Sequence, residues 1–598
     1  MPQAKGSGRK RAPARRPPPR RRPPLRRRRR RANGRRRLLA LLILSVLAFL
    51  AISGRLIVLQ VFDAGSLDQA AARQRTTVID LPATRGRIFD RNLNDLAISI
   101  PARSVWADPR LVKDKPGTAA RLARVLGVKK ATLAGRLASK GRFVYLVRRI
   151  PKARGDIVQR LNLPGVFVEG AVARRYPSGS VAAQVLGFVG IDGNGQAGIE
   201  QQYDGLLRGN AGKILLERDP QGRAIPQGRR SLEPAEPGTD LVLTIDQHLQ
   251  YVTEQALYRA VRQHKAKAGS VVVMSPRTGE VLAMANVPTF DPNRITARTK
   301  AEARKNRAIA DVFEPGSTNK TITAAAALQH GIVTPRTETI VPDNIPLCPE
   351  KTFRDSHSHA PELMTFADIV AKSSNVGTIM AARDLGRDRL YKAELDFGYG
   401  RKSGVDLPGE SPGIVRDAKS WYCTDLGTNA IGQGVAVTVL QMASVYATVA
   451  NNGVLRSPTL LRGTVDARGH IAKAARKPGR RVLSARTAKS LSKILEGVVK
   501  EGGTGTQAAM EEWRVAGKTG TARKPDNVRG GYRPGAYVGS FIGYAPAEKP
   551  AVVVAVVIDE PTRGYYGGSV AAPVFREVTG TALRRLGVVP TLPAKAVR

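Results

Sequence analysis

Residues 314–329 have the sequence EPGSTNKTITAAAALQ, and this stretch decides the fold because it combines a helix start with a reactive pair. A Pro-Gly pair comes immediately before the helix that we predict over 321–329, so Ser317 lies near its N-terminus. Lys320 follows three residues later and lies on the same helical face. A neutral amine there can take the hydroxyl proton, and the helix dipole favours negative charge that develops nearby. The pattern is therefore typical of an activated serine nucleophile.

Two further motifs strengthen this interpretation. On its own Ser-x-x-Lys is weak evidence, because a chain of this length contains it about twice by chance, and the alternative is a helical serine beside a solvated lysine. Ser373 and Asn375 form a Ser-x-Asn element directly after a helix that we predict over 366–371. Residues 518–521 (Lys-Thr-Gly-Thr) follow the first of three strands predicted near the C-terminus. The three motifs in this order are the signature of a serine transferase.

Two other motifs fail on their local context. The Gly-Lys-Thr at 517–519 resembles the end of a phosphate-binding loop, but such a loop needs glycine at position 512, where Glu512 stands. Residues 409–413 form a Gly-x-Ser-x-Gly string around Ser411, but Pro412 has no N–H to donate to an oxyanion. No sequence feature ties any of the six histidines to Ser411, so we interpret this string as a turn rather than part of a Ser-His-Asp triad.

The C-terminal part of the chain has a regular order of elements. We predict a helix-rich stretch from about 315 to 500, preceded by a helix and a hairpin and followed by three strands and a last helix. The flanking elements are a helix over 247–264, hairpin strands over 270–274 and 281–285, strands over 513–516, 536–544 and 551–559, and a helix over 571–586. This order predicts a mixed α/β domain over 236–598, with an antiparallel sheet covered by helices. Residues 63–235 offer no nucleophile with a base, so we expect a scaffold domain there.

The net charge of +49 over 598 residues suggests a polyanionic partner, such as nucleic acid or anionic lipid. Residues 1–37 contain 18 of the lysines and arginines, no acid and seven prolines, so we expect a disordered basic tail. The tail has no aromatic residue to stack on bases, which argues against specific nucleic-acid recognition and favours anionic lipid as its partner.

A membrane anchor is expected over residues 38–62. Residues 38–53 carry no charge, and the apolar character resumes after Arg55, whose side chain could extend to the interface. The alternative is a signal peptide cleaved near Ser53, but the long basic leader and the apolar continuation favour an uncleaved anchor. The basic side should stay cytoplasmic, which exports the rest of the chain.

The chain has two cysteines, Cys348 and Cys423, and they flank the Ser-x-Asn element. In an oxidising compartment they form either a disulfide or two buried thiols, and the sequence leaves both open. Cys348 also stands near Asp355, His357 and His359, which together resemble a set of metal ligands.

The chain resembles the class B penicillin-binding proteins over nearly its whole exported length. The three motifs carry the likeness, together with the strings at 85–99, 176–200, 287–293, 431–434 and 565–568. The resemblance implies a penicillin-binding/β-lactamase-like transpeptidase fold over 236–598 and a pedestal or dimerisation-type domain over 63–235. It also implies that the enzyme uses neither a cofactor nor a metal.

The resemblance further implies a role for each motif. Ser317 would be acylated by the penultimate D-Ala of a peptidoglycan stem peptide, which releases the terminal D-Ala, and an amine of a neighbouring stem would resolve the ester into a cross-link. Lys320 would be the base, and burial and the like charge of Lys518 should both lower its pKa. Ser373 and Asn375 would relay protons and bind the substrate amide, and Lys518 and Thr519 would bind the terminal carboxylate. The N–H groups of Ser317 and Thr521 would form an oxyanion hole. The implied substrate-binding residues are thus Thr519, Gly520 and Thr521. Asn319 departs from the family, which often has an apolar residue there, so we expect altered local packing.

Within the family, the strings TFDPN and YYGG-x-VAAPVF and the single basic tail favour the septal type over the elongation type. The chain lacks the glycosyltransferase domain of a class A enzyme, the extra membrane helices of a penicillin sensor and the deacylation motif of a β-lactamase. The implied partners are stem peptides, β-lactams, the septal glycosyltransferase and other division membrane proteins. Cytoplasmic division proteins join anionic lipid as expected partners of the tail.

Overall fold

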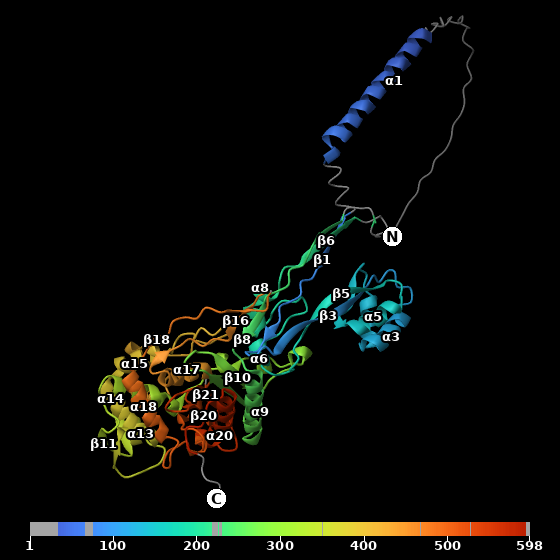
Figure 1. The fold of residues 1–598 in the computed structure, drawn as a ribbon. Coiled ribbons are helices and arrows are strands. Elements are labelled where there is room, and N and C mark those ends of the chain that lie inside the picture. Colours follow the sequence, from blue (N-terminus) through green and yellow to red (C-terminus); the bar gives the residue numbers. More distant parts are fainter. Residues whose placement is uncertain are drawn as a thin grey trace, which may run out of the picture. The chain divides into compact units, whose positions relative to one another are not determined.

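The structure is a computed structural model that describes residues 34–65, 76–217, 225–226, 230–349, 351–466, 468–526 and 528–593 (Figure 1). The chain divides into two compact units, one of residues 1–79 and 215–231 and the other of residues 80–214 and 232–598. The expected disordered tail lies outside the described residues up to position 33. Three short strands lie near the limits of the units, namely β1 (Thr76–Leu81), β6 (Gly212–Glu217) and β7 (Arg230–Glu233).

The first unit contains the expected apolar helix. Helix α1 (Gly34–Ile57) continues into a π-helical turn, η1 (Val58–Phe62), and together they span 29 residues, with a mean hydropathy of 2.5 over a window of 18 residues. The helix begins four residues before the expected anchor, because Arg35 to Arg37 already adopt helical geometry. No residue of α1 is buried in the protein. Its length and composition therefore suit a single membrane span.

The second unit begins with a lobe in which three strands pack on three helices. Strand β3 is central, because it pairs antiparallel with β4 on one side and with β5 on the other. Leu122, Leu133 and Leu146 are fully buried in the core between the strands and the helices. The elements are β3 (Asp95–Ala107), β4 (Val144–Pro151), β5 (Val166–Arg175), α3 (Lys115–Leu126), α4 (Lys130–Leu137) and α5 (Lys152–Arg160).

This lobe shares a seven-stranded sheet with the C-terminal part of the chain. The strand order is β17-β16-β8-β2-β3-β4, with β5 added on β3. The further strands are β2 (Ile88–Phe89), β8 (Asp240–Leu243), β16 (Leu461–Val465) and β17 (Ile471–Lys473). The boundary expected near residue 236 therefore falls beside a strand that pairs with both parts of the chain.

A buried ionic cluster joins two of the strings on which the family likeness rests. Glu200 is fully buried and accepts from Arg85 Nε and Arg174 Nε, each at 2.6 Å. Arg85 also contacts Asp204 at 2.6 Å, and Tyr176 donates its hydroxyl to Glu200 at 3.2 Å. Short helices α6 (Ala183–Leu186), α7 (Gly198–Gln202) and α8 (Asp204–Leu207) carry the acidic partners and their surroundings.

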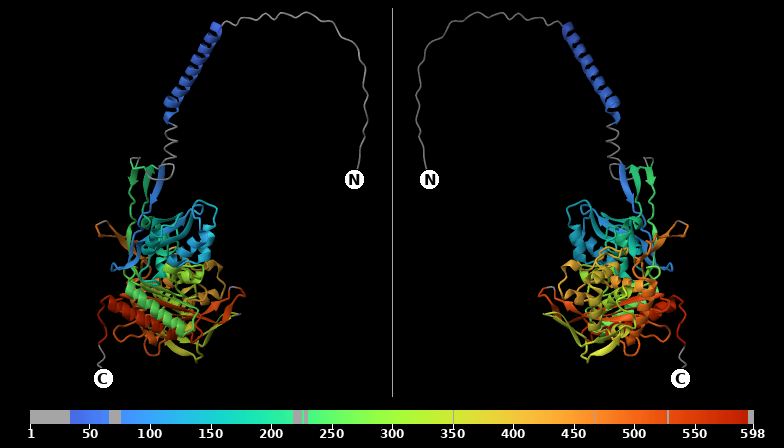
Figure 2. Two further views of the ribbon diagram at one scale, coloured as in Figure 1. Left: turned by 90° about the vertical axis from the view of Figure 1, so that its right-hand side faces the viewer. Right: turned by 90° about the vertical axis from the view of Figure 1, so that its left-hand side faces the viewer.

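The five-stranded sheet of the C-terminal part has the order β10-β9-β21-β20-β19, and all of its pairs are antiparallel. Helices α9 and α20 lie side by side on one face, where Val271 and Val556 point, and α17 packs on the other face (Figure 2). The elements are α9 (Gln247–Gln263), β9 (Ala268–Met274), β10 (Val281–Val287), α17 (Val439–Ala450), β19 (Ala516–Pro525), β20 (Tyr532–Ala545), β21 (Val552–Asp559), α19 (Gly567–Val570) and α20 (Ala572–Arg585). The expected mixed α/β fold is confirmed.

The expected helix-rich stretch is present, but it also contains short strands that the sequence did not predict. Besides α17, its helices are α12 (Lys320–Gln329), α13 (Phe366–Ala371), α14 (Asn375–Leu385), α15 (Arg387–Asp396), α16 (Asp425–Ala430) and α18 (Ala485–Gly497), with 3-10 turns at Gly316–Asn319 and Ala418–Ser420. Before this stretch lie a 3-10 turn at Pro292–Arg294, α10 (Ala301–Arg304) and α11 (Arg307–Ala310), and after it lies a 3-10 turn at Thr506–Ala508. The strands of the helix-rich stretch pair as β11 (Glu338–Val341) with β14 (Glu362–Thr365), β12 (Asn344–Cys348) with β13 (Lys351–Arg354), and β15 (Val454–Leu455) with β18 (Arg480–Arg481).

Candidate active site

Ser317 lies in the 3-10 turn Gly316–Asn319, which leads directly into α12. Gly316 has a φ of +55°, and a Cβ there would stand 3.3 Å from that of Ala522 on β19. Its N–H donates to Gly432 O at 2.9 Å. Tyr446 fixes the turn from the helical side by donating its hydroxyl to Thr318 O at 3.0 Å. The turn Gly316–Asn319, called the nucleophile turn because it carries the predicted nucleophile, is therefore held between β19 and the helix that carries Tyr446.

Lys320 is fully buried, and its amine is held by the Ser-x-Asn element. Nζ donates to Ser373 O at 2.6 Å and to Asn375 Oδ1 at 2.7 Å, with Ser373 Oγ at 3.4 Å. Burial lowers the pKa of Lys320 to about 7, although the charge of Asp355 raises it. In the part of the chain that the structure describes, no hydrogen bond joins Ser317 to Lys320. The amine of Lys320 therefore titrates near neutral pH, three residues after Ser317 in the chain.

The Ser-x-Asn element lies at the start of α14. Ser373 adopts a φ of +63°, an unusual conformation for a residue with a side chain. Ser374 caps α14, because its Oγ accepts from Gly377 N at 2.9 Å. Asn375 donates its side-chain N–H to Arg354 O at 2.8 Å, which leaves its oxygen directed at Lys320. These bonds fix both groups that hold the lysine.

Lys518 and Thr519 lie within β19, so the motif extends the strand that the sequence predicts over 513–516. Lys518 is fully buried, and its Nζ is 3.4 Å from Thr519 Oγ1. Burial lowers the pKa of Lys518 well below its ordinary value, and the like charge of Lys320 lowers it further. Thr504, which the sequence did not indicate, shares a hydrogen bond of 2.7 Å with the Thr519 hydroxyl.

The remaining part of this strand borders the nucleophile turn. A Cβ at Gly520 would stand 2.9 Å from Pro315 O and 2.4 Å from Ser540 Oγ, so the close approach requires glycine. Thr521 accepts from Gly567 N at 3.1 Å through its hydroxyl. Because β19 is the edge strand of its sheet, one side of its backbone can pair with an extended substrate.

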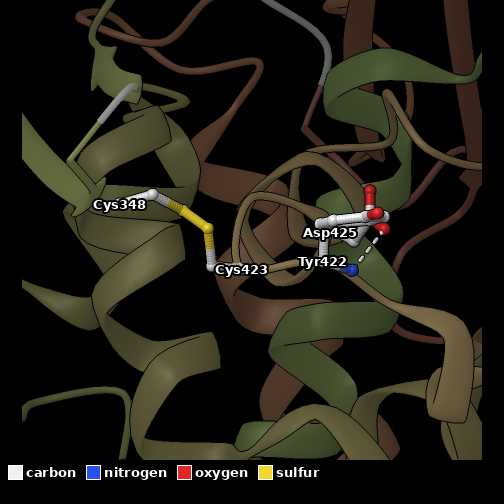
Figure 3. The surroundings of a disulfide bond; sticks show 4 residues. All are labelled: Cys348, Tyr422, Cys423 and Asp425. Carbon is white, nitrogen blue, oxygen red and sulfur yellow. Dashed lines mark hydrogen bonds between the residues drawn. A yellow bond between two sulfur atoms is a disulfide. The ribbon is translucent and has the colours of Figure 1, made fainter.

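The other motifs of the sequence do not form a second catalytic centre. Ser411 accepts from Gly413 N at 3.2 Å in a loop, and among the described residues no histidine hydrogen-bonds to it. Cys348 forms a disulfide with Cys423 (Figure 3), which removes the thiolate from the metal-like cluster. The disulfide also settles the alternatives that the sequence left open for the two cysteines.

Asn319 makes polar contacts where an apolar residue was expected. It is fully buried, donates to Asn429 O at 2.8 Å and accepts from the Tyr399 hydroxyl at 2.9 Å. The altered packing expected at this position is therefore a buried hydrogen-bond network beneath the nucleophile turn.

The site combines a serine, a nearby lysine with a pKa of about 7 and a bordering edge strand. This arrangement suits acyl transfer through a serine ester, and the protein is a serine acyl-transfer enzyme. Two family models match the chain: "Penicillin binding protein transpeptidase domain" over residues 269–580 and "Penicillin-binding Protein dimerisation domain" over residues 80–243. The chain belongs to the class B penicillin-binding proteins, which are peptidoglycan D,D-transpeptidases.

Named relatives and solved structures agree with this assignment. The chain is 37% identical over 526 residues to the "Probable peptidoglycan D,D-transpeptidase PenA" of Neisseria meningitidis, covering 86% of this chain and 87% of the relative. It is 36% identical over 562 residues to the "Peptidoglycan D,D-transpeptidase FtsI" of Escherichia coli, covering 92% and 91%. The crystal structure of penicillin-binding protein 3 of Mycobacterium tuberculosis with aztreonam has a TM-score of 0.68 and 31% identity, covering 86% of this chain and 100% of that one. The septal type favoured by the sequence is supported by these relatives.

Proposed function

We propose that Ser317 is the acylated nucleophile and Lys320 the base of a stem-peptide cross-linking reaction. The observation that carries this proposal is the buried Lys320 amine, which has a pKa of about 7 and is held by Ser373 and Asn375 close to the nucleophile turn. Neutral Lys320 takes the Ser317 proton while the oxygen attacks the carbonyl of the penultimate D-Ala. The oxyanion is stabilised by the N–H groups of Ser317 and Thr521.

The second half of the reaction uses the same groups in the opposite direction. Collapse of the tetrahedral adduct breaks the peptide bond, and the leaving amine of D-Ala takes a proton through Ser373. Lys518 and Thr519 hold the terminal carboxylate, and a stem amide lies between Asn375 and the open edge of β19. After D-Ala leaves, an amine of a neighbouring stem attacks the ester, returns its proton to Lys320 and frees Ser317. A β-lactam enters the same path at the first step and remains on the serine.

We also propose that α1 anchors the chain with its N-terminus in the cytoplasm and the enzyme outside, since the basic residues precede the helix. The septal glycosyltransferase and other division membrane proteins are its expected partners in the membrane. The basic tail is expected to contact anionic lipid or cytoplasmic division proteins.

Labelling with a fluorescent penicillin tests the nucleophile. The full-length protein in membranes should label, and Ser317→Ala should not, whereas Ser411→Ala should label like the wild type and serve as the matched control. Equal labelling of Ser317→Ala and the wild type would show that another residue is acylated.

A further inference from the structure

The carboxylate of Asp355 holds the start of α14. It accepts from Ser374 Oγ at 2.7 Å, from Val376 N at 3.0 Å and from Asn375 N. The side chain is only 9% exposed, so water competes weakly for these bonds. The carboxylate therefore fixes the Ser-x-Asn element whose oxygen atoms hold the Lys320 amine.

His359 holds this carboxylate from the opposite side. Its Nε2 lies 3.1 Å from Asp355 Oδ2, and its Nδ1 lies 2.7 Å from Ala360 O. A carbonyl oxygen and an ionised carboxylate can only accept, so both ring nitrogens must carry protons for both bonds to form. The geometry therefore requires a positively charged imidazolium.

The surroundings of His359 favour that charge. The bonds to Ala360 O and Asp355 raise the pKa of His359, and the charge of Asp343 raises it further. Asp343 also accepts from His359 N at 3.2 Å. Asp355 also raises the pKa of Lys320, which is the cation of the site that responds to this carboxylate. The Ala360 carbonyl, Asp355 and Asp343 thus favour the protonated ring of His359.

The segment between these groups is fixed at its other end by the disulfide. Cys348 ends β12, and the paired strand β13 runs straight into Asp355. The disulfide ties this hairpin to Cys423, two residues before α16 (Figure 3). The covalent link holds one end of the hairpin, and the contact between Asp355 and His359 adds to the bonds that hold the other end against α14.

We propose that His359 is a positioning residue that acts through Asp355 to hold Ser373 and Asn375 against Lys320. The proposal rests on the function proposed above, because its readout is acylation of the same serine. Below its raised pKa, His359 makes both bonds and the element is held. As the pH rises through that pKa, His359 loses one of its two hydrogen bonds. The Ser-x-Asn element is then held less firmly, and acylation of Ser317 slows.

The test is the rate of acylation by a fluorescent penicillin, measured for the full-length protein in membranes between pH 6 and pH 9. In His359→Gln a single amide nitrogen replaces two ring nitrogens that stand at different positions, so it can reach only one of the two acceptors. We expect its acylation step at pH 7 to be slower by about tenfold, with little change in the affinity of the preceding complex. The acylation rate of the wild type should decline as the pH rises above the pKa of His359, and this decline should be absent from the pH profile of His359→Gln. His357→Gln is the matched control, because His357 is exposed and makes no side-chain hydrogen bond in the described chain.

Two further variants separate charge from shape. His359→Arg keeps a permanent charge and several donors, so it should restore most of the rate and remain active at alkaline pH. Asp343→Asn removes a carboxylate that faces His359 and keeps the backbone bond from Asp355 N to Asp343 O, and it should move the alkaline decline to lower pH even if His359→Gln fails to fold. A wild-type profile for both His359→Gln and Asp343→Asn would overturn the proposal. Ser317→Ala in the same assay distinguishes failure of this proposal from failure of the proposed function. Labelling of Ser317→Ala would overturn the proposed function instead.

Discussion

The acylation rate should fall steeply as pH is lowered, because protonation removes the base. With the Lys320 pKa at about 7, roughly 90% of the amine is neutral at pH 8 and about 1% at pH 5. If neutral Lys320 takes the Ser317 proton, the rate should fall nearly a hundredfold between these two values, by about tenfold for each unit below pH 6. The magnitude follows from burial of the amine, since an ordinary lysine would be almost fully protonated throughout this range.

Stopped-flow or quenched labelling with a penicillin measures this rate at saturating and at limiting drug concentrations. Thermal unfolding recorded at each pH is the control, because the fall must occur while the protein stays folded. A rate that is independent of pH between 5 and 8 would refute the assignment of Lys320 as the base. A midpoint near the ordinary lysine pKa would refute the argument from burial.

Three substitutions test other parts of the structure. Glu200→Gln removes the buried acid shared by Arg174 and Arg85, of which Arg85 keeps Asp204, and should destabilise the protein by about 3–5 kcal/mol, seen as a lower Tm, whereas Glu577→Gln at an exposed ion pair should cost less than about 1 kcal/mol. Gly316→Ala forces a side chain into a left-handed conformation at a cost of about 1–2 kcal/mol, and the displaced nucleophile turn should slow penicillin labelling. Thr504→Val removes the partner of the Thr519 hydroxyl, so binding of the substrate carboxylate should weaken several-fold and raise KM more than it lowers kcat.

The sequence predicted the elements whose pattern is local. The helix over 247–264, the hairpin after it and the final helix correspond to α9, β9 with β10, and α20. The strands β11 to β14, of four or five residues each, were missed, because such short runs carry little periodicity and form through pairing with each other. The start of β19 was placed too early, since Gly and Thr in the motif hide the strand pattern.

The candidate site likewise contains residues that a local pattern indicates and residues that only the packing of the chain brings together. The three motifs could be found from their spacing, and the structure brings Lys320, Ser373, Asn375 and Lys518 close together. The support given by Asp355 could not be found in this way. It appeared in the sequence as a metal-like ligand, because only the packing of a hairpin against α14 turns its carboxylate toward backbone N–H groups.

The seven-stranded sheet has a consequence for biosynthesis. Strand β8 lies between β2 and β16, but β16 follows it in the chain only after roughly 220 residues. A chain that grows from its N-terminus therefore carries an open sheet edge at β8 until most of the catalytic domain has been made. Molecules that stop before residue 461 keep this edge exposed, which invites aggregation and proteolysis. Closure of the sheet thus separates chains that include β16 from chains that stop before it.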